Sequence, residues 1–184
     1  MHAPEPNRWK GLVLGVVGGA AGVVAMGYYW QAVTALTGQD PRQATTGAGP
    51  HALDDISLVG VQHQGDESST AAIGRLADQA LTGKEPRKET KALLSTGVHW
   101  GYGLLVGGLY GLGRGGTARP PDGRGGLIYG TGVWLLGSEV ALPLLGLTAG
   151  PTTQPVASHA YGLGAHWAYG LATAATTQVL YQLL

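Results

Sequence analysis

Residues 140–184 read VALPLLGLTAGPTTQPVASHAYGLGAHWAYGLATAATTQVLYQLL, and they contain no Asp, Glu, Lys or Arg. The surface of a soluble domain has to face water, so a soluble domain almost never leaves its last quarter without a charged side chain. A lipid environment is the simpler explanation for such a stretch. We therefore expect an integral membrane protein.

The composition of the whole chain agrees with this expectation. Charged residues make up 12% of the 184 residues, and Gly occurs 33 times. The charged share is about half the usual one. Lys and Arg together number 11, as do Asp and Glu, so no basic field attracts nucleic acid. The absence of Cys excludes disulfides, thiolate catalysis and Cys-based zinc sites.

Four apolar segments are long enough to cross a bilayer, which takes about 20 helical residues. They cover about residues 11–36, 92–113, 125–148 and 155–184. The polar loop 37–91 separates the first two, and helix-capping serines and apolar residues at helical spacing predict a short amphipathic helix at about 70–82 within it. That helix could lie on the membrane surface or over the mouth of the bundle. The expected fold is all-α: a polytopic membrane protein with four transmembrane helices in a Gly-rich bundle.

The first apolar segment has an alternative interpretation as a signal peptide. Arg8 and Lys10 form a short basic start, and Val33-Thr34-Ala35 resembles a cleavage site. The apolar run is long for a signal peptide, however, and residues 28–30 (Tyr-Tyr-Trp) are typical of an anchor at the membrane interface. We therefore expect a retained helix.

Four spans would place both termini on one side of the membrane. Arg8 and Lys10 would lie on that side together with Arg114, Arg119 and Arg124. The positive-inside rule then predicts that both termini are cytoplasmic. The long loop carries an equal number of basic residues near the membrane, but long loops follow the rule less well.

Glycines recur every four residues in three of the segments. The series are Gly11, Gly15 and Gly19 with Gly18 and Gly22 in the first, Gly97 and Gly101 with Gly103, Gly107 and Gly111 in the second, and Gly126 and Gly130 in the third. This spacing lets helix backbones approach closely in a membrane. It predicts a compact bundle, or a homo-oligomer or a complex with another membrane protein that uses the surplus faces.

Short Gly and aromatic motifs occur along all four segments. They are Gly11-Leu-Val-Leu-Gly15 and onward to Met26, His99-Trp-Gly-Tyr-Gly103, Tyr129-Gly130, Leu142-Pro143 and His166-Trp167-Ala-Tyr-Gly170. In these motifs the chain resembles the YagU-like group of small bacterial inner-membrane proteins, whose function is uncharacterised. The resemblance implies an inner-membrane location and a helical architecture, and it carries over no reaction.

Ionisable residues inside a span are costly and are candidates for function. Here they are His99, Glu139, His159 and His166. The helical rise places His99, Glu139 and His166 roughly 10–14 Å from the membrane face that adjoins the long loop. We therefore expect these three to interact, with His159 nearer the surface. Because Pro143 has no N–H to donate to the Glu139 carbonyl, we also expect a kink in the third helix.

Several chemistries fit this polar cluster. A carboxylate beside imidazoles could relay protons, or it could hold helices together by hydrogen bonds. A His and Glu metal site and a haem with His159 and His166 as axial ligands are weaker alternatives, because no metal-binding spacing supports them. No nucleophile and base stand in a catalytic pattern, so we expect neither an enzyme nor a cofactor. The favoured function is a structural or accessory membrane component, and the alternative is a small conductor or binder of protons, metal ions or solutes.

Overall fold

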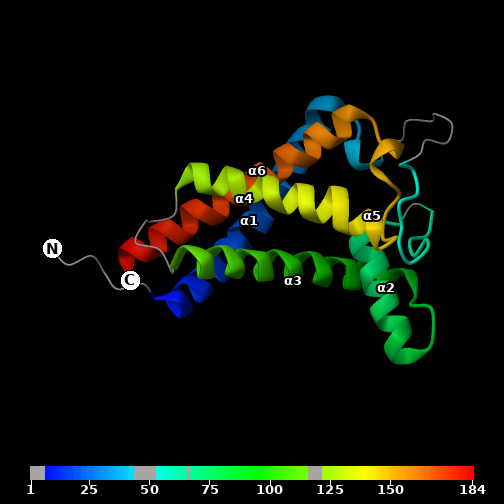
Figure 1. Cartoon of the computed structure of the whole chain (residues 1–184), viewed down its shortest axis with the longest axis horizontal. Helices are drawn as coiled ribbons and strands as arrows, with labels where there is room; N and C mark the ends of the chain where they lie inside the picture. The colour runs from blue at the N-terminus through cyan, green and yellow to red at the C-terminus, as the bar shows by residue number, and fades with distance from the viewer. Residues whose placement is uncertain (1–6, 44–52, 66, 116–121) are drawn as a thin grey trace.

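A computed structural model describes residues 7–43, 53–65, 67–115 and 122–184 (Figure 1). All regular structure in these residues is helical, which confirms the expected all-α class. The elements are α1 (Arg8–Thr37), η1 (Pro41–Gln43), α2 (Ser69–Thr82), α3 (Lys88–Gly115), α4 (Gly123–Val133), η2 (Trp134–Ala141), α5 (Leu142–Leu144), η3 (Pro151–Thr153) and α6 (Val156–Leu183). Arg119 and part of the long polar loop lie outside the described residues.

The four long helical segments alternate in direction. α1 packs against both α3 and α6, and α4 packs against α6 (Figure 1). Tyrosine side chains join α3 to the other helices: Tyr169 of α6 donates a hydrogen bond to the Gly103 carbonyl at 2.7 Å, and Tyr129 of α4 donates one to the Val106 carbonyl. Removal of α1 as a signal peptide would take away the helix on which α3 and α6 both pack.

Glycine backbones make the closest contacts between helices. A Cβ atom added to Gly107 of α3 would lie 2.6 Å from the Gly15 carbonyl oxygen of α1, and one added to Gly126 of α4 would lie 2.7 Å from the Gly170 carbonyl of α6. No real side chain tolerates such distances. Most glycines of the predicted four-residue series lie at close contacts between helices, among them Gly15, Gly19, Gly103, Gly107, Gly111, Gly126 and Gly130. The expectation for Gly97 and Gly101 is wrong within this chain, because both face open space.

Polar caps define the ends of the shorter helices. The Ser68 side chain accepts a hydrogen bond from the Ala71 N–H at the start of α2, and Gly83 ends the helix with a φ of 70°, in the left-handed region. Asp122 caps α4 in the same way. These residues satisfy backbone groups that a helix end leaves unpaired. The structure thus has α2 at Ser69–Thr82 where the sequence predicted a helix at about 70–82.

The third apolar segment departs from the expected helix. It runs from Gly123 to Leu144 instead of reaching residue 148, and helical structure continues through Pro143. The backbone widens to a π-helix over Trp134–Ala141, and the Leu142 N–H donates to the Gly137 carbonyl five residues earlier. Pro143 therefore falls in the first turn of the short α5, where a missing N–H is tolerated. The wider turn ends one residue before Leu142, just ahead of the position at which the sequence predicted a kink.

The long polar loop folds back over one end of the helices. The N–H groups of Gln62 and His63 both donate to the Gly146 carbonyl, at 2.8 and 2.9 Å. Arg75 of α2 pairs with Glu67 at 2.9 Å, and each side chain is only 5% exposed. The loop is thus fixed to the end of α5 on one side and to α2 on the other.

Among the residues that the structure describes, two helical segments are long and apolar enough to cross a membrane by length and composition. They are Arg8–Thr37, with a mean hydropathy of 1.8, and Gly123–Leu144, with a mean hydropathy of 1.3. α3 and α6, with 28 residues each, are also long enough, but their Gly, Thr, His and Tyr residues make them less apolar. The remaining two expected spans stay a prediction.

Candidate functional site

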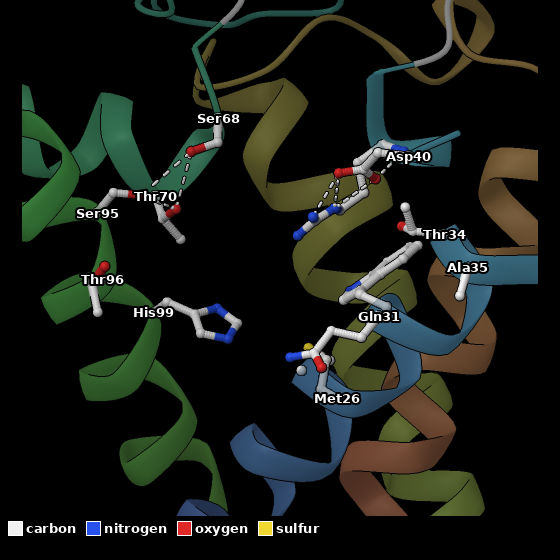
Figure 2. Close-up of a pocket in the computed structure, with 13 residues that line it drawn as sticks. Met26, Gln31, Thr34, Ala35, Asp40, Ser68, Thr70, Ser95, Thr96 and His99 are labelled. Atoms are coloured by element: carbon white, nitrogen blue, oxygen red, sulfur yellow. Dashed lines mark hydrogen bonds and ion pairs between the residues drawn. The ribbon is translucent and has the colours of Figure 1, made fainter. Parts of the chain in front are cut away.

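Two adjoining cavities lie at the end of the bundle that the long loop covers. The first, which we call the Glu139 cavity, has a volume of about 320 Å³ and is lined by side chains of η2 and α6 that include Glu139, His159 and His166. The second, the α1–α3 cleft, has a volume of about 790 Å³ and is lined by polar side chains of α1, α2 and α3 that include His99 (Figure 2). Both volumes are typical of small-molecule sites.

A hydrogen-bonded pair stands on the wall of the Glu139 cavity. His159 Nδ1 lies 2.9 Å from Glu139 Oε2, and His159 Nε2 lies 2.8 Å from the Pro151 carbonyl oxygen. The two side chains are only 22% and 18% exposed. A carbonyl can only accept, so Nε2 carries a proton. A second proton must then lie between Nδ1 and the carboxylate, on one or the other.

The pair therefore has two forms of equal total charge. In one form an imidazolium faces a carboxylate, and in the other a neutral imidazole faces a carboxylic acid. Moving the shared proton between Nδ1 and Oε2 interconverts them. The shared proton can therefore move between the two side chains without a change in their heavy-atom geometry.

The two remaining histidines have different surroundings. His166 Nδ1 donates to the Gly162 carbonyl of its own helix at 2.8 Å, so its neutral form leaves Nε2 as an acceptor. This hydrogen bond lies within α6 and joins His166 to no other helix. His99 has no hydrogen-bond partner within the described part of the chain, and its ring points from α3 toward Gln31 and Met26 of α1 (Figure 2). Each imidazole lines a cavity, and each has a ring nitrogen that can form a further hydrogen bond.

Arg42 stands at the boundary between the two cavities and lines both. Its Nη2 lies 2.6 Å from Asp40 Oδ2 and its Nε lies 2.9 Å from Oδ1, a bidentate pair. The guanidinium also lies over the ring of Trp30, 5.1 Å from its centroid. The hydrogen bond from Arg42 holds the pKa of Asp40 below its usual range, and burial opposes this only in part. Asp40 is therefore ionised at neutral pH and compensates the charge of Arg42.

The structure corrects the expected composition of the cluster. Glu139 bonds to His159, which the sequence placed near the surface, and not to His99 or His166. His166 shares the cavity with the pair, whereas His99 lines the neighbouring α1–α3 cleft. All four residues nevertheless lie at the end of the bundle that adjoins the long loop, as their depths predicted.

Sequence reasoning missed the polar groups that the loop and its flanks contribute. Asp40 and Arg42 come from the turn after α1, and Ser68 and Thr70 come from the start of α2. The short spacing of Asp40 and Arg42 hinted at a local ion pair. No sequence signal placed it beside Trp30 and the histidines.

Metal and haem chemistry receives no support from the arrangement. Within the described ranges, no group of three or more His, Asp or Glu side chains gathers closely enough to hold a metal ion. Both ring nitrogens of His159 already have hydrogen-bond partners, so an axial haem bond would have to break one of them.

Comparison with protein families, with curated proteins and with solved structures finds no match to this chain. The site therefore has to be interpreted from its own geometry.

Proposed function

We propose that the chain is a multi-pass protein of the bacterial inner (plasma) membrane, with α1, α3, α4–α5 and α6 as its four spans and both termini cytoplasmic. Large apolar side chains cover much of its surface, and part of its interior is polar. The largest fully buried side chains among the described residues are Thr173 and Thr177. Large apolar side chains lie exposed on all four helices, among them Val13, Leu105, Ile128, Leu136, Leu171 and Val179. Lipid can cover such a surface, and small residues suit close packing between membrane helices.

Within this bundle, the function that the geometry supports best is proton binding and relay through the Glu139 cavity. The observation that carries it is the 2.9 Å contact between His159 Nδ1 and Glu139 Oε2, with the second ring nitrogen of His159 held by the Pro151 carbonyl. His166 lines the same cavity with a free acceptor nitrogen. Water in the cavity can carry a proton between the pair and this imidazole.

A structural or accessory role is the second candidate, and the glycine faces favour it. The contacts between α1 and α3 and between α4 and α6 make a rigid bundle. Gly97 and Gly101 remain free on the outside of α3 for a second copy or for another membrane protein. Membership of the YagU-like group, supported by the Gly and aromatic motifs, is compatible with either function.

Proton flux into liposomes tests the relay. The purified protein is reconstituted in vesicles that contain a pH-sensitive dye, and the outside solution is then made more acidic than the inside. We expect faster acidification than in empty vesicles, loss of the difference in Glu139→Gln, and wild-type flux in the matched control Glu89→Gln, whose side chain is exposed in the first turn of α3. Flux equal to that of empty vesicles would exclude the relay and leave the structural role.

A further inference from the structure

The α1–α3 cleft is open because the two helices separate beyond their glycine contacts. α1 and α3 meet along Gly11 to Val23, where Val23 packs against Gly103. Farther along, a Cβ atom added to Gly27 of α1, which lines the cleft, would meet nothing within 4 Å. The cleft therefore extends between the two helices, below the start of α2 (Figure 2).

The lining of the cleft is dense in uncharged hydrogen-bonding groups. Five hydroxyl groups, one carboxamide, one imidazole and one indole ring take part: Thr34, Ser68, Thr70, Ser95, Thr96, Gln31, His99 and Trp30. Thr70 Oγ1 and Ser95 Oγ lie 2.8 Å apart and join α2 to α3. Gln31 and His99 have no hydrogen-bond partner in the part of the chain that the structure describes. Each hydroxyl can donate one hydrogen bond and accept others.

The charged groups of the cleft compensate each other. Among the described lining residues, Asp40 and Arg42 are the acidic and basic members, and they form a bidentate pair at 2.6 and 2.9 Å. An anion or a cation would have to compete with this pair for its partner. A neutral ligand with several hydroxyl groups meets no such cost.

We infer that the α1–α3 cleft binds an uncharged polyhydroxy group, of the kind presented by a sugar ring. Hydroxyl, carboxamide and imidazole groups beside an indole ring match such a group, because its hydroxyls need both donors and acceptors and its C–H face packs on an aromatic surface. Two sources supply this chemistry, a glycolipid headgroup and a free sugar. The lipid source rests on the membrane placement proposed above, whereas the binding site itself does not depend on proton relay.

Binding to defined probes tests the inference. The detergent-purified full chain is titrated with methyl β-glucoside by calorimetry. It is also reconstituted in phosphatidylcholine nanodiscs that contain monoglucosyl diacylglycerol or, separately, phosphatidylserine, and retained lipid is counted by native mass spectrometry. We expect the glucosyl probe to be retained in preference to phosphatidylserine. Binding of methyl β-glucoside as well would indicate a free sugar as a source, and retention of the glucolipid alone would indicate a lipid ligand.

Two isosteric variants locate the site. Gln31→Leu removes the unpartnered carboxamide of the cleft without touching a helix contact, and we expect it to weaken binding about threefold to tenfold, the loss of one hydrogen bond. Gln182→Leu makes the same change at an exposed position of α6 outside the cleft and should leave binding unchanged. Preference for phosphatidylserine, no retention of either glucosyl probe, or equal effects of the two variants would overturn the inference. Proton flux is measured separately, so its failure would not affect this result.

Discussion

Glu139 and His159 are the residues on which the proposed relay depends, and their pairing is open to direct measurement. Hydrogen bonds with a charged member contribute about 1.5–3 kcal/mol, and partial exposure reduces this. The Pro151 carbonyl orients the imidazole, so the carboxylate meets a preorganised partner. The pair should therefore behave as a unit.

A double-mutant cycle checks the pairing. Glu139→Gln and His159→Gln are measured alone and together by chemical unfolding in detergent. We expect a coupling energy of about 1 kcal/mol for this pair and near-additivity for Glu139→Gln with His166→Gln, because His166 bonds to Gly162 instead. Coupling between Glu139 and His166, with none between Glu139 and His159, would show that the carboxylate has a different partner in solution.

Glu67 is the second residue with a sharp prediction. Burial would raise the pKa of its carboxyl, but hydrogen bonds from Arg75, from the Gln64 N–H and from Lys91 outweigh burial and hold it below the usual 4.5. A depressed pKa means that the stabilisation is complete above about pH 4.5 and is lost as the pH falls through the lower, folded-state value.

Hydrogen–deuterium exchange of α2 as a function of pH measures this effect. Protection should fall on acidification below about pH 4.5, because protonated Glu67 no longer pairs with Arg75. Glu67→Gln should remove most of that pH dependence, and Glu67→Ala should lower the free energy of opening by about 3 kcal/mol. The exposed Glu89→Gln serves as the control. A wild-type pH profile in Glu67→Gln would refute the role of this ion pair.

At the scale of elements, the glycines of α3 divide into two classes on one helix. Gly107 contacts the backbone of α1, and Gly101 faces open space. Gly107→Ala should lower stability by about 1–3 kcal/mol, because the added methyl group meets the Gly15 carbonyl at 2.6 Å. Gly101→Ala should be neutral or should raise stability by up to about 1 kcal/mol through helix propensity.

Thermal unfolding of the two variants in the same detergent distinguishes these outcomes. Equal melting temperatures would mean that α1 and α3 do not meet at Gly107. A large loss in Gly101→Ala would mean that this open face is buried against a second copy, which the oligomer size of the variant would then reveal.

The helices also show what the sequence could predict and where it failed. Four-residue glycine spacing identified the contact faces because the period of a helix determines which residues share a face. The π-helix over Trp134–Ala141 has no such signal in the sequence. The helical segment that contains it ends at Leu144, with α5. Glu139 consequently lies about 8 Å from that end and His159 about 5 Å from the start of α6, by helical rise. The two side chains are therefore level, and His166 lies about 10 Å deeper than His159.

At the scale of the whole molecule, the long loop decides the site, and its position was not predictable. Thr152 donates a hydrogen bond to Asp54, 98 residues earlier in the chain. Ser158 donates one to the Pro41 carbonyl, 117 residues earlier. Local propensity contains no information about such pairs. The alternation of apolar and polar segments, in contrast, predicted the helices and the end of the bundle at which the polar groups meet.

Single-cysteine labelling tests whether the chain forms a four-span bundle with its cavities on the side of the long loop. The chain contains no Cys, so each introduced thiol reports alone. Asn7→Cys, Gly113→Cys and Leu184→Cys probe one end of the bundle, and Asp55→Cys and Thr82→Cys probe the other (Figure 1). A membrane-impermeant maleimide should label the last two in spheroplasts and the first three only in inverted membrane vesicles. Labelling of all five from one face, or of Asn7→Cys and Leu184→Cys from opposite faces, would contradict the account.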